Sequence, residues 1–309
     1  LNYLESLHQD FCQQLKNAYQ VLKDIAFKNC ITDRDGTINN YCARYPSSIQ
    51  SAYNAIFLSL FVKQAKPHMI ILSSAPLDNP GLMDMMVTPD DLFIYAGSKG
   101  QDTIDKTGRR HQYPVDQEKK AILSLLNHEL TTLIRRPEYE IFSYIGSGLQ
   151  LKQGQTTVAY QDIDESIKED VSRNFQQKIL DIVRQHDPNG IMFRIEDTGK
   201  DLEIILTIPD PAHPQSYKDF DKADAVRFLN EELALHMEEA DNLICGDTLS
   251  DIPMLEAAMM LSNKCHAVFV TKDESLKKIA RHHCKNTIFL SEPDILIALF
   301  NRLAKKGRP

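Results

Sequence analysis

Features that would mark several classes of protein are missing from this sequence. None of its 309 residues belongs to a run approaching the 18 consecutive apolar residues of a membrane-spanning helix, and we find no signal-peptide pattern. Basic residues are in the minority, with 35 Lys and Arg against 43 Asp and Glu. The resulting net charge of −8 argues against nucleic acid as a partner. We therefore expect this chain to bind neither a membrane nor a nucleic acid.

Paired cysteines are missing as well. The six cysteines form no Cys-x-x-Cys pair, and Cys30 and Cys245 fall inside apolar runs of strand length. Free cysteine in such a position behaves as a small hydrophobic side chain. We therefore predict a cytoplasmic protein, in a reducing compartment, without structural disulfides or a zinc site.

The order of apolar and polar residues predicts an α/β fold in two parts. Strand-length apolar runs alternate with amphipathic segments in residues 25–112 and again in 218–309, which is typical of a parallel sheet flanked by helices. In residues 113–217 the strands cluster around two helices, which indicates an inserted α+β layer. We predict a core made of the two outer ranges and a cap made of the range between them.

The predicted cap elements are short and regular. Helices are expected at 116–134 and 163–185, and strands at 139–145, 148–152, 156–161, 191–196 and 202–208. Prolines crowd the next segment, residues 209–214, which we interpret as the hinge that returns the chain to the core.

A helix is predicted ahead of the core, over residues 1–24. Its apolar residues recur at steps of three and four: Leu4, Leu7, Phe11, Leu15, Tyr19 and Leu22. Two interpretations stay open. The helix packs on the core, or it ends a helical domain that lies upstream and binds a protein partner.

The segment ITDRDGT, residues 31–37, is the most informative motif. Asp33 and Asp35 stand at the end of a predicted strand, where open α/β sheets place their chemistry. In an extended Asp-x-Asp both side chains point the same way, so the carboxylates repel unless a cation such as Mg²⁺ or a shared proton compensates. One carboxylate can then attack phosphorus while the other handles the leaving-group proton. Gly36 permits a tight turn with room for a phosphate.

Three further segments place polar residues at a strand end or a helix start. In chain order these residues are Ser73 and Ser74, then Lys222, then Asp247 and Asp251. Together with the aspartate motif, and in this order, they resemble the four motifs of the haloacid dehalogenase phosphatases. The insertion between the second and third motifs resembles the C2-type cap of that superfamily. The resemblance implies a Rossmann-like core with a parallel sheet and an inserted α+β cap.

The same resemblance implies roles for the core residues. Asp33 would be the nucleophile that forms an aspartyl-phosphate, and Asp35 would be the general acid and base. Lys222 and Ser74 would hold phosphate oxygens, with Ser73 as the alternative to Ser74.

A magnesium site is implied at the same place. The carboxylates of Asp33 and Asp247 and the backbone carbonyl of Asp35 would hold Mg²⁺, with Asp251 supporting directly or through water.

One subfamily, the trehalose-6-phosphate phosphatases, is similar in the cap. Residues 150–161, QLKQGQTTVAYQ, resemble its strand segment with a Lys and a turn Gly, and Glu203 fits its last cap strand. The resemblance implies that Gln150, Lys152 and Glu203 bind the sugar phosphate, together with Gly36 and Thr37 of the first motif.

Several positions depart from that subfamily. Its Ser-Gly-Arg, His-Gly and His-Tyr-Arg are replaced by Ser74-Ala75-Pro76, Ser98-Lys99-Gly100 and Ala159-Tyr160-Gln161, and Ser250-Asp251-Ile252-Pro253 stands in the fourth motif. These changes leave the core chemistry intact and indicate a divergent branch, similar to the nematode type.

Alternatives stay open for the activity and for the cap. The substrate is trehalose 6-phosphate, or a sucrose-phosphate or mannosyl-phosphoglycerate type of sugar phosphate. The same fold also serves as a non-catalytic scaffold, or as a phosphotransferase that hands the phosphate to a second sugar. Lys152 and Glu203 are also compatible with a solvated cross-strand pair that contacts no substrate.

Overall fold

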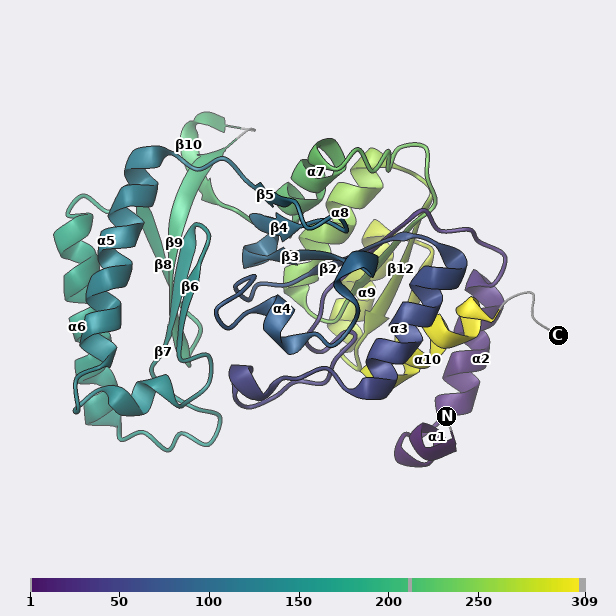
Figure 1. The fold of residues 1–309 in the computed structure, drawn as a ribbon, viewed down its shortest axis with the longest axis horizontal. Helices are drawn as coiled ribbons and strands as arrows, with labels where there is room; N and C mark the ends of the chain where they lie inside the picture. The colour runs from purple at the N-terminus through teal and green to yellow at the C-terminus, as the bar shows by residue number, and fades with distance from the viewer. Residues whose placement is uncertain (1, 211–212, 306–309) are drawn as a thin grey trace.

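The computed structural model, which describes residues 2–210 and 213–305, has an eight-stranded sheet at the centre of its larger lobe (Figure 1). The strand order is β13-β12-β11-β1-β2-β3-β4-β5. Strands β13 to β3 pair in parallel, and β4 and β5 add an antiparallel hairpin at one edge. The strands are β1 (Asn29–Thr32), β2 (His68–Leu72), β3 (Ile94–Gly97), β4 (Asp102–Ile104), β5 (Arg110–Gln112), β11 (Asn242–Gly246), β12 (Cys265–Val270) and β13 (Thr287–Leu290).

Helices cover both faces of this sheet, which explains why its central strands are apolar throughout. In β1, Cys30 packs into the core cluster on one face and Ile31 into the cluster on the other. One face carries α2 (Phe11–Leu22), α3 (Ala52–Ala65) and α10 (Pro293–Ala304), and the other carries α7 (Lys222–Glu232), α8 (Ile252–Leu261) and α9 (Glu274–His283). The predicted fold class is confirmed for this lobe.

The N-terminal segment forms two helices rather than the single helix predicted over residues 1–24. The helix α1 (Asn2–Leu7) stops before Asp10, which has a left-handed backbone with φ of 57°, and α2 then begins. His8, at the break, contacts the carboxylate of Asp294 at 2.7 Å. The buried residues of α2 pack into the core cluster, so this helix is part of the core packing.

The cap is the smaller lobe, and its sheet faces the core while two helices cover its outer face (Figure 1). The strand order is β10-β9-β7-β6, with β8 also paired to β9, and all of these pairs are antiparallel. The elements are α5 (Gln117–Ile134), β6 (Leu149–Lys152), β7 (Gln155–Ala159), α6 (Glu169–His186), β8 (Phe193–Asp197), β9 (Asp201–Asp210) and β10 (His213–Asp219).

The strand predicted at residues 139–145 is wrong, because this segment contains a short 3₁₀ helix, Glu140–Ser143. Tyr139, Phe142 and Ile145 are buried at steps of three, which is the period of a 3₁₀ helix. Phe142 stacks on the α6 residue Phe175 with ring centroids 3.9 Å apart. Packing against the helix therefore decided the conformation.

Three other cap predictions need correction. The second cap helix begins at Glu169, six residues later than the predicted range of 163–185. The segment 209–214 does not simply form a return hinge, since its ends belong to β9 and β10, while residues 211–212 lie outside the described residues. The strand β10 also runs through the predicted cap boundary at residue 217.

The cap contacts the core at more than one place. The Gln153 amide, in the β6–β7 turn, donates to the Ser98 hydroxyl of the core at 3.1 Å. The Tyr45 amide of the core donates to the Gly146 carbonyl of the cap at 3.1 Å. These contacts hold the inner face of the cap sheet opposite the ends of the core strands.

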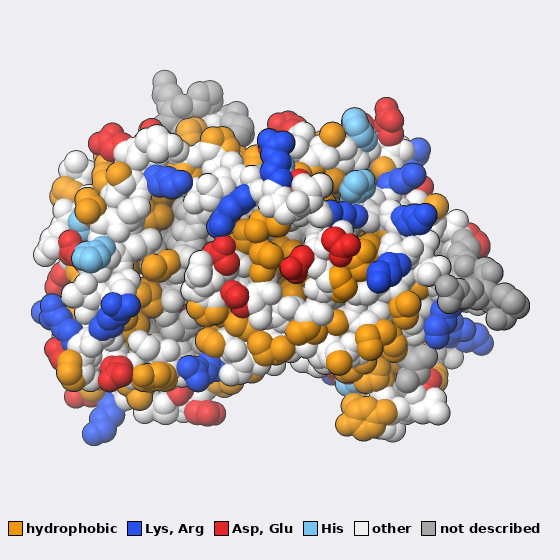
Figure 2. Space-filling view, in the orientation of Figure 1, with side chains coloured by type: hydrophobic (Ala, Val, Ile, Leu, Met, Phe, Trp, Pro, Cys, Tyr) orange, Lys and Arg blue, Asp and Glu red, His pale blue; other side chains and the backbone are white. Residues whose placement is uncertain are grey.

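None of the described helices is long and apolar enough to cross a bilayer. On the face drawn in Figure 2, Lys and Arg side chains are scattered among acidic and apolar ones and form no continuous basic tract of described residues.

A buried histidine fastens the edge hairpin of the core to α7. His111 of β5 contacts Glu232, at the end of α7, at 2.8 Å and Asp105, in the hairpin turn, at 2.9 Å. Burial opposes its charge, but the hydrogen bonds to Glu232 and Asp105 outweigh burial and raise the pKa of His111 above 6.5.

The raised pKa of His111 predicts a pH-dependent contribution to stability. A group whose pKa is raised by folding stabilises below its unfolded-state pKa and loses that contribution as pH rises through its folded-state pKa. We expect His111→Gln to lower the free energy of unfolding by about 1 kcal/mol at pH 6 and by much less at pH 9. Urea unfolding at both pH values measures this, with the exposed His128→Gln as control. An equal loss at both pH values would contradict the prediction.

Candidate active site

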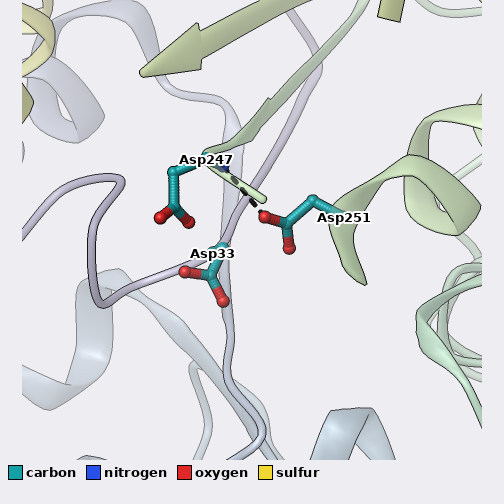
Figure 3. A group of neighbouring side chains, drawn as sticks. All are labelled: Asp33, Asp247 and Asp251. Atoms are coloured by element: carbon teal, nitrogen blue, oxygen red, sulfur yellow. Dashed lines mark hydrogen bonds between the residues drawn. The ribbon is translucent and has the colours of Figure 1, made fainter. Parts of the chain in front are cut away.

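The parallel register brings three carboxylates to one edge of the core sheet. The strands β1 and β11 are neighbours, and the Asp33 amide, just beyond β1, donates to the Cys245 carbonyl of β11 at 2.9 Å. Asp33 and Asp247 therefore leave adjacent strands side by side, and Asp251 follows one turn later. One carboxylate oxygen from each of the three residues lies within 4.8 Å of the other two, and Figure 3 shows the three side chains as neighbours.

Asp251 is fixed by the turn that follows β11. One of its oxygens, Oδ2, accepts hydrogen bonds from the amides of Asp247 and Thr248 at 2.9 and 3.0 Å. A Cβ atom on Gly246 would lie 2.4 Å from the Asp251 Cβ, so the turn needs glycine there for close approach. The Asp251 side chain is completely buried, and its other oxygen, Oδ1, accepts from Lys222 within the cluster.

Lys222 joins two of these carboxylates. Its ammonium lies 2.5 Å from Asp33 Oδ1 and 2.5 Å from Asp251 Oδ1. It stands at the first position of α7, which is fixed by a capping box in which Asp221 accepts from the amides of Ala223 and Asp224. Burial opposes the charge of Lys222, but Asp33 and Asp251 outweigh burial and raise its pKa well above the usual value.

One lysine does not balance three carboxylates. Burial raises the pKa of Asp33, and Asp251 and Asp247 raise it further while Lys222 lowers it. Burial also raises the pKa of Asp247 to about 6. Crowded oxygen ligands that carry excess negative charge are the donor set that a hard divalent cation prefers. Asp33, Asp247 and Asp251 therefore fit a metal ion, and the chemistry of the site does not distinguish Mg²⁺ from Mn²⁺.

Gly36 and Thr37 pack against this cluster. Gly36 has φ of +87°, and a Cβ atom there would lie 2.1 Å from Asp247 Oδ2, so a larger residue would displace that carboxylate. The buried Thr37 hydroxyl lies 3.1 Å from Asp247 Oδ1 and 3.4 Å from Asp33 Oδ2, as a donor to either. Both residues were predicted to bind substrate, and the structure places them where they shape the carboxylate cluster.

Asp35 points away from the cluster and toward the cap. Its Oδ1 atom accepts from the Arg34 guanidinium at 2.5 Å and from the Ser48 hydroxyl at 2.8 Å. No hydrogen bond from the described residues reaches its Oδ2 atom. The Asp35 carboxylate is therefore not one of the clustered oxygens, and only the predicted role of its backbone carbonyl stays open for the metal.

Arg34 and Tyr41 were not singled out from the sequence. Arg34 is fully buried and donates to the side chain and the carbonyl of Ser48 as well as to Asp35. Tyr41 donates its hydroxyl to Asp247 Oδ2 at 2.6 Å. Both belong to the motif or to the irregular loop that follows it, where no periodicity indicates a direction for the side chains.

The two serines of the second motif differ in exposure. Ser73 is buried, and its hydroxyl accepts from the Ala75 amide at 3.2 Å. Ser74 is exposed. The choice between them as phosphate ligand stays a prediction.

The predicted sugar-binding residues of the cap lie on its inner sheet. Lys152 is 8% exposed, and no hydrogen bond or ion pair from the described residues reaches its ammonium. Burial lowers the pKa of Lys152 to about 8, while Glu203 opposes that shift. Lys152 and Glu203 are not a cross-strand pair, because β7 lies between their strands. The Glu203 carboxylate instead lies 3.8 Å from the ammonium of the core residue Lys99. Lys99 belongs to one of the segments in which the sequence departs from the resembling subfamily.

A pocket of about 270 Å³ separates the cap from the core beside Asp35. Its core wall includes Tyr41 and Tyr45, and its cap wall includes Asp201. Gln150 does not reach this pocket and lines a neighbouring one of about 500 Å³, on the other side of Tyr45. Of the predicted core residues, Asp33, Lys222, Asp247 and Asp251 are thus brought together, whereas the three predicted cap residues are spread over the cap sheet.

Comparison with protein families assigns most of the chain. Residues 30–296 match the family described as trehalose-6-phosphate phosphatase, C-terminal. The predicted resemblance is confirmed by this match.

Individual relatives agree in part. The chain is 30% identical over 298 residues to alpha,alpha-trehalose-phosphate synthase [UDP-forming] 2 of Caenorhabditis elegans, covering 94% of this chain and 24% of that protein. It is 28% identical over 280 residues to a trehalose-phosphatase of Caenorhabditis elegans, covering 88% of this chain and 62% of that protein. The chain thus spans about a quarter of the synthase and less than two thirds of the phosphatase.

Among solved structures, the C-terminal domain of trehalose-6-phosphate phosphatase from C. albicans superimposes with a TM-score of 0.60 at 14% identity. The match covers 94% of this chain and 96% of that one. At this identity the likeness establishes the fold alone.

Proposed function

Because this chain belongs to the trehalose-6-phosphate phosphatase family, we propose that it is a metal-dependent phosphatase that hydrolyses trehalose 6-phosphate to trehalose and phosphate. One observation carries the proposal. Asp33, Asp247 and Asp251 converge within 4.8 Å, with Lys222 bonded to two of them. This arrangement at one sheet edge supports a nucleophile, a phosphate-binding cation and a set of metal ligands, as phosphoryl transfer through an aspartate requires.

The first step uses Asp33. Its carboxylate attacks phosphorus, the ester oxygen leaves, and an aspartyl-phosphate forms. Lys222 holds the side chain of Asp33 at 2.5 Å and can donate to phosphate oxygens from the same place. Ser74 or Ser73 supplies a further donor from the end of β2. Bound Mg²⁺, held by Asp33, Asp247 and Asp251, would offset the negative charge of the transferring group.

Asp35 performs the proton transfers. Asp35 lines the pocket between cap and core. When the phosphate of the substrate lies at Asp33, the leaving sugar oxygen would therefore lie near Asp35. Arg34 and Ser48 orient the carboxylate through Oδ1, and Oδ2 remains for the proton. Asp35 gives this proton to the leaving oxygen, then takes one from the water that attacks the aspartyl-phosphate, which releases phosphate.

The charge of the pocket favours an uncharged leaving group. Three carboxylates line it, those of Asp35, Asp162 and Asp201, against one basic side chain, Lys200. A disaccharide suits such a wall because hydroxyls donate to carboxylates, whereas the carboxylate of a phosphoglycerate would be repelled. This supports trehalose 6-phosphate or sucrose 6-phosphate over a mannosyl-phosphoglycerate substrate.

The cap residues provide a test of the substrate. Lys152 is mostly buried, and no hydrogen bond or ion pair from the described residues reaches its ammonium, which leaves this group free to bind a sugar hydroxyl. We expect Lys152→Ala and Glu203→Ala each to lower kcat/KM for trehalose 6-phosphate roughly ten- to a hundredfold, since charge-assisted hydrogen bonds contribute about 1.5–3 kcal/mol. p-Nitrophenyl phosphate, which has no sugar, should lose far less.

The matched control is Lys178→Ala, which removes an exposed lysine from the outer cap helix α6. It should leave both substrates unaffected. If Lys152→Ala and Glu203→Ala also hydrolyse the disaccharide like the wild type, these residues do not bind the sugar.

A non-catalytic scaffold is the second candidate. It is favoured by the C. elegans relative at 30% identity, which is named as a trehalose-phosphate synthase. A scaffold does not need the residues of the four motifs. The chain nevertheless has Asp33, Asp35, Lys222, Asp247 and Asp251. Release of phosphate from trehalose 6-phosphate by the purified chain, with Mg²⁺ present, separates the two.

The cysteines are compatible with a cytoplasmic location. All six are free, and four of them are buried. Buried thiols without disulfides suit a reducing compartment.

A further inference from the structure

A tyrosine outside the four motifs contacts one of the three clustered carboxylates. The Tyr41 hydroxyl donates to Asp247 Oδ2 at 2.6 Å, while the Thr37 hydroxyl lies 3.1 Å from Oδ1 of the same carboxylate. The two oxygens of Asp247 are thus held from opposite sides. Each carboxylate oxygen has two lone-pair directions, so the oxygens of Asp247 can accept these hydrogen bonds and still bind a metal ion.

The ring of Tyr41 packs closely on Gly36. A Cβ atom on Gly36 would lie 2.5 Å from Tyr41 Cε2, so the ring packs on the backbone of the aspartate motif. Most of the residue is nevertheless exposed, at 68%, so burial of an apolar surface does not explain its position. The hydrogen bond to Asp247 is the specific contact that the hydroxyl makes.

The same residue also reaches the substrate pocket. Tyr41 and Asp35 line the pocket between cap and core, on the side of the leaving group. One side chain therefore contacts a metal ligand and forms a wall for the substrate. Such a residue is placed to keep the ligand oriented while the substrate enters.

We propose that Tyr41 is a positioning residue that holds Asp247 in the orientation needed to bind the metal ion. This inference rests on the proposed metal-dependent function and adds a residue that acts through a ligand. Partners that orient metal ligands typically contribute ten- to a hundredfold to metal affinity. Without the hydrogen bond from Tyr41, the Asp247 carboxylate would have to be ordered at the moment when the ion binds.

The test compares two exposed tyrosines that each donate to a carboxylate. Tyr41→Phe removes only the hydroxyl that contacts Asp247. Tyr144→Phe removes a hydroxyl that donates to Glu140 at 3.0 Å, outside the site. Isothermal titration of substrate-free protein with MgCl₂ gives Kd without any need for turnover. We expect Kd to rise roughly tenfold or more in Tyr41→Phe and to stay unchanged in Tyr144→Phe.

A double-mutant cycle assigns the effect to the carboxylate. In an Asp247→Asn background, Tyr41→Phe should change the remaining Mg²⁺ affinity much less than in the wild type. Wild-type affinity in Tyr41→Phe, or an equal loss in both backgrounds, would overturn the role of Tyr41 while leaving the proposed function intact. A wild type that binds no Mg²⁺ would instead overturn the metal-dependent function together with this inference.

Discussion

Replacing the nucleophile should abolish turnover without unfolding the protein. We expect Asp33→Asn to lower phosphate release by roughly three orders of magnitude or more, because an amide is a poor nucleophile and a weaker metal ligand. The fold should persist. Asp33 lies in a cluster with excess negative charge, and Lys222 keeps its contact with Asp251 at 2.5 Å when Asp33 becomes neutral.

Steady-state phosphate release and thermal unfolding, measured on the same preparation, check this expectation. The control is Asp91→Asn, which makes the same chemical change at an exposed position of the core. It should retain full activity. If Asp33→Asn releases phosphate at a rate close to that of the wild type, the nucleophile is another residue.

Removal of the metal should have an effect of similar size. EDTA is expected to stop phosphate release and excess Mg²⁺ to restore it, because a single lysine cannot balance three clustered carboxylates and an incoming phosphate. Ca²⁺ should inhibit, since its larger and looser oxygen shell favours a different carboxylate geometry.

Thermal unfolding provides a second readout of the metal. A cation that binds only the folded protein raises Tm in a concentration-dependent way. We expect Mg²⁺ to raise Tm of the wild type and to raise it less in Asp247→Asn. Full activity in metal-free buffer, with no shift of Tm, would rule out the proposed site.

The core motifs could be predicted because strand ends converge in a parallel sheet. Periodicity places Asp33 and Asp247 at strand ends and Lys222 at a helix start, and the resemblance to the haloacid dehalogenase phosphatases implied that they share one edge. The roles of Arg34 and Tyr41 could not be predicted in this way. They depend on an irregular loop, in which the path of the chain is set by contacts with Ser48 and Asp247 that are distant in sequence.

The cap shows where local patterns fail. A strand was predicted over residues 139–145, but the segment contains a 3₁₀ helix, in which Phe142 stacks on Phe175. The strand β10 was missed because prolines stand where it begins. Lys152 and Glu203 were expected as a pair, but the pairing of Glu203 with Lys99 of the core follows from how the two lobes meet.

The account is tested most directly by the phosphate that the wild-type chain releases from a panel of sugar phosphates with Mg²⁺ present. It predicts that trehalose 6-phosphate is hydrolysed to trehalose and free phosphate, with a higher kcat/KM than sucrose 6-phosphate and far above mannosyl-phosphoglycerate. No release above that of Asp33→Asn from any of these compounds would contradict the account and favour the scaffold. Transfer of the phosphate to a second sugar, without free phosphate, would contradict it in favour of a phosphotransferase.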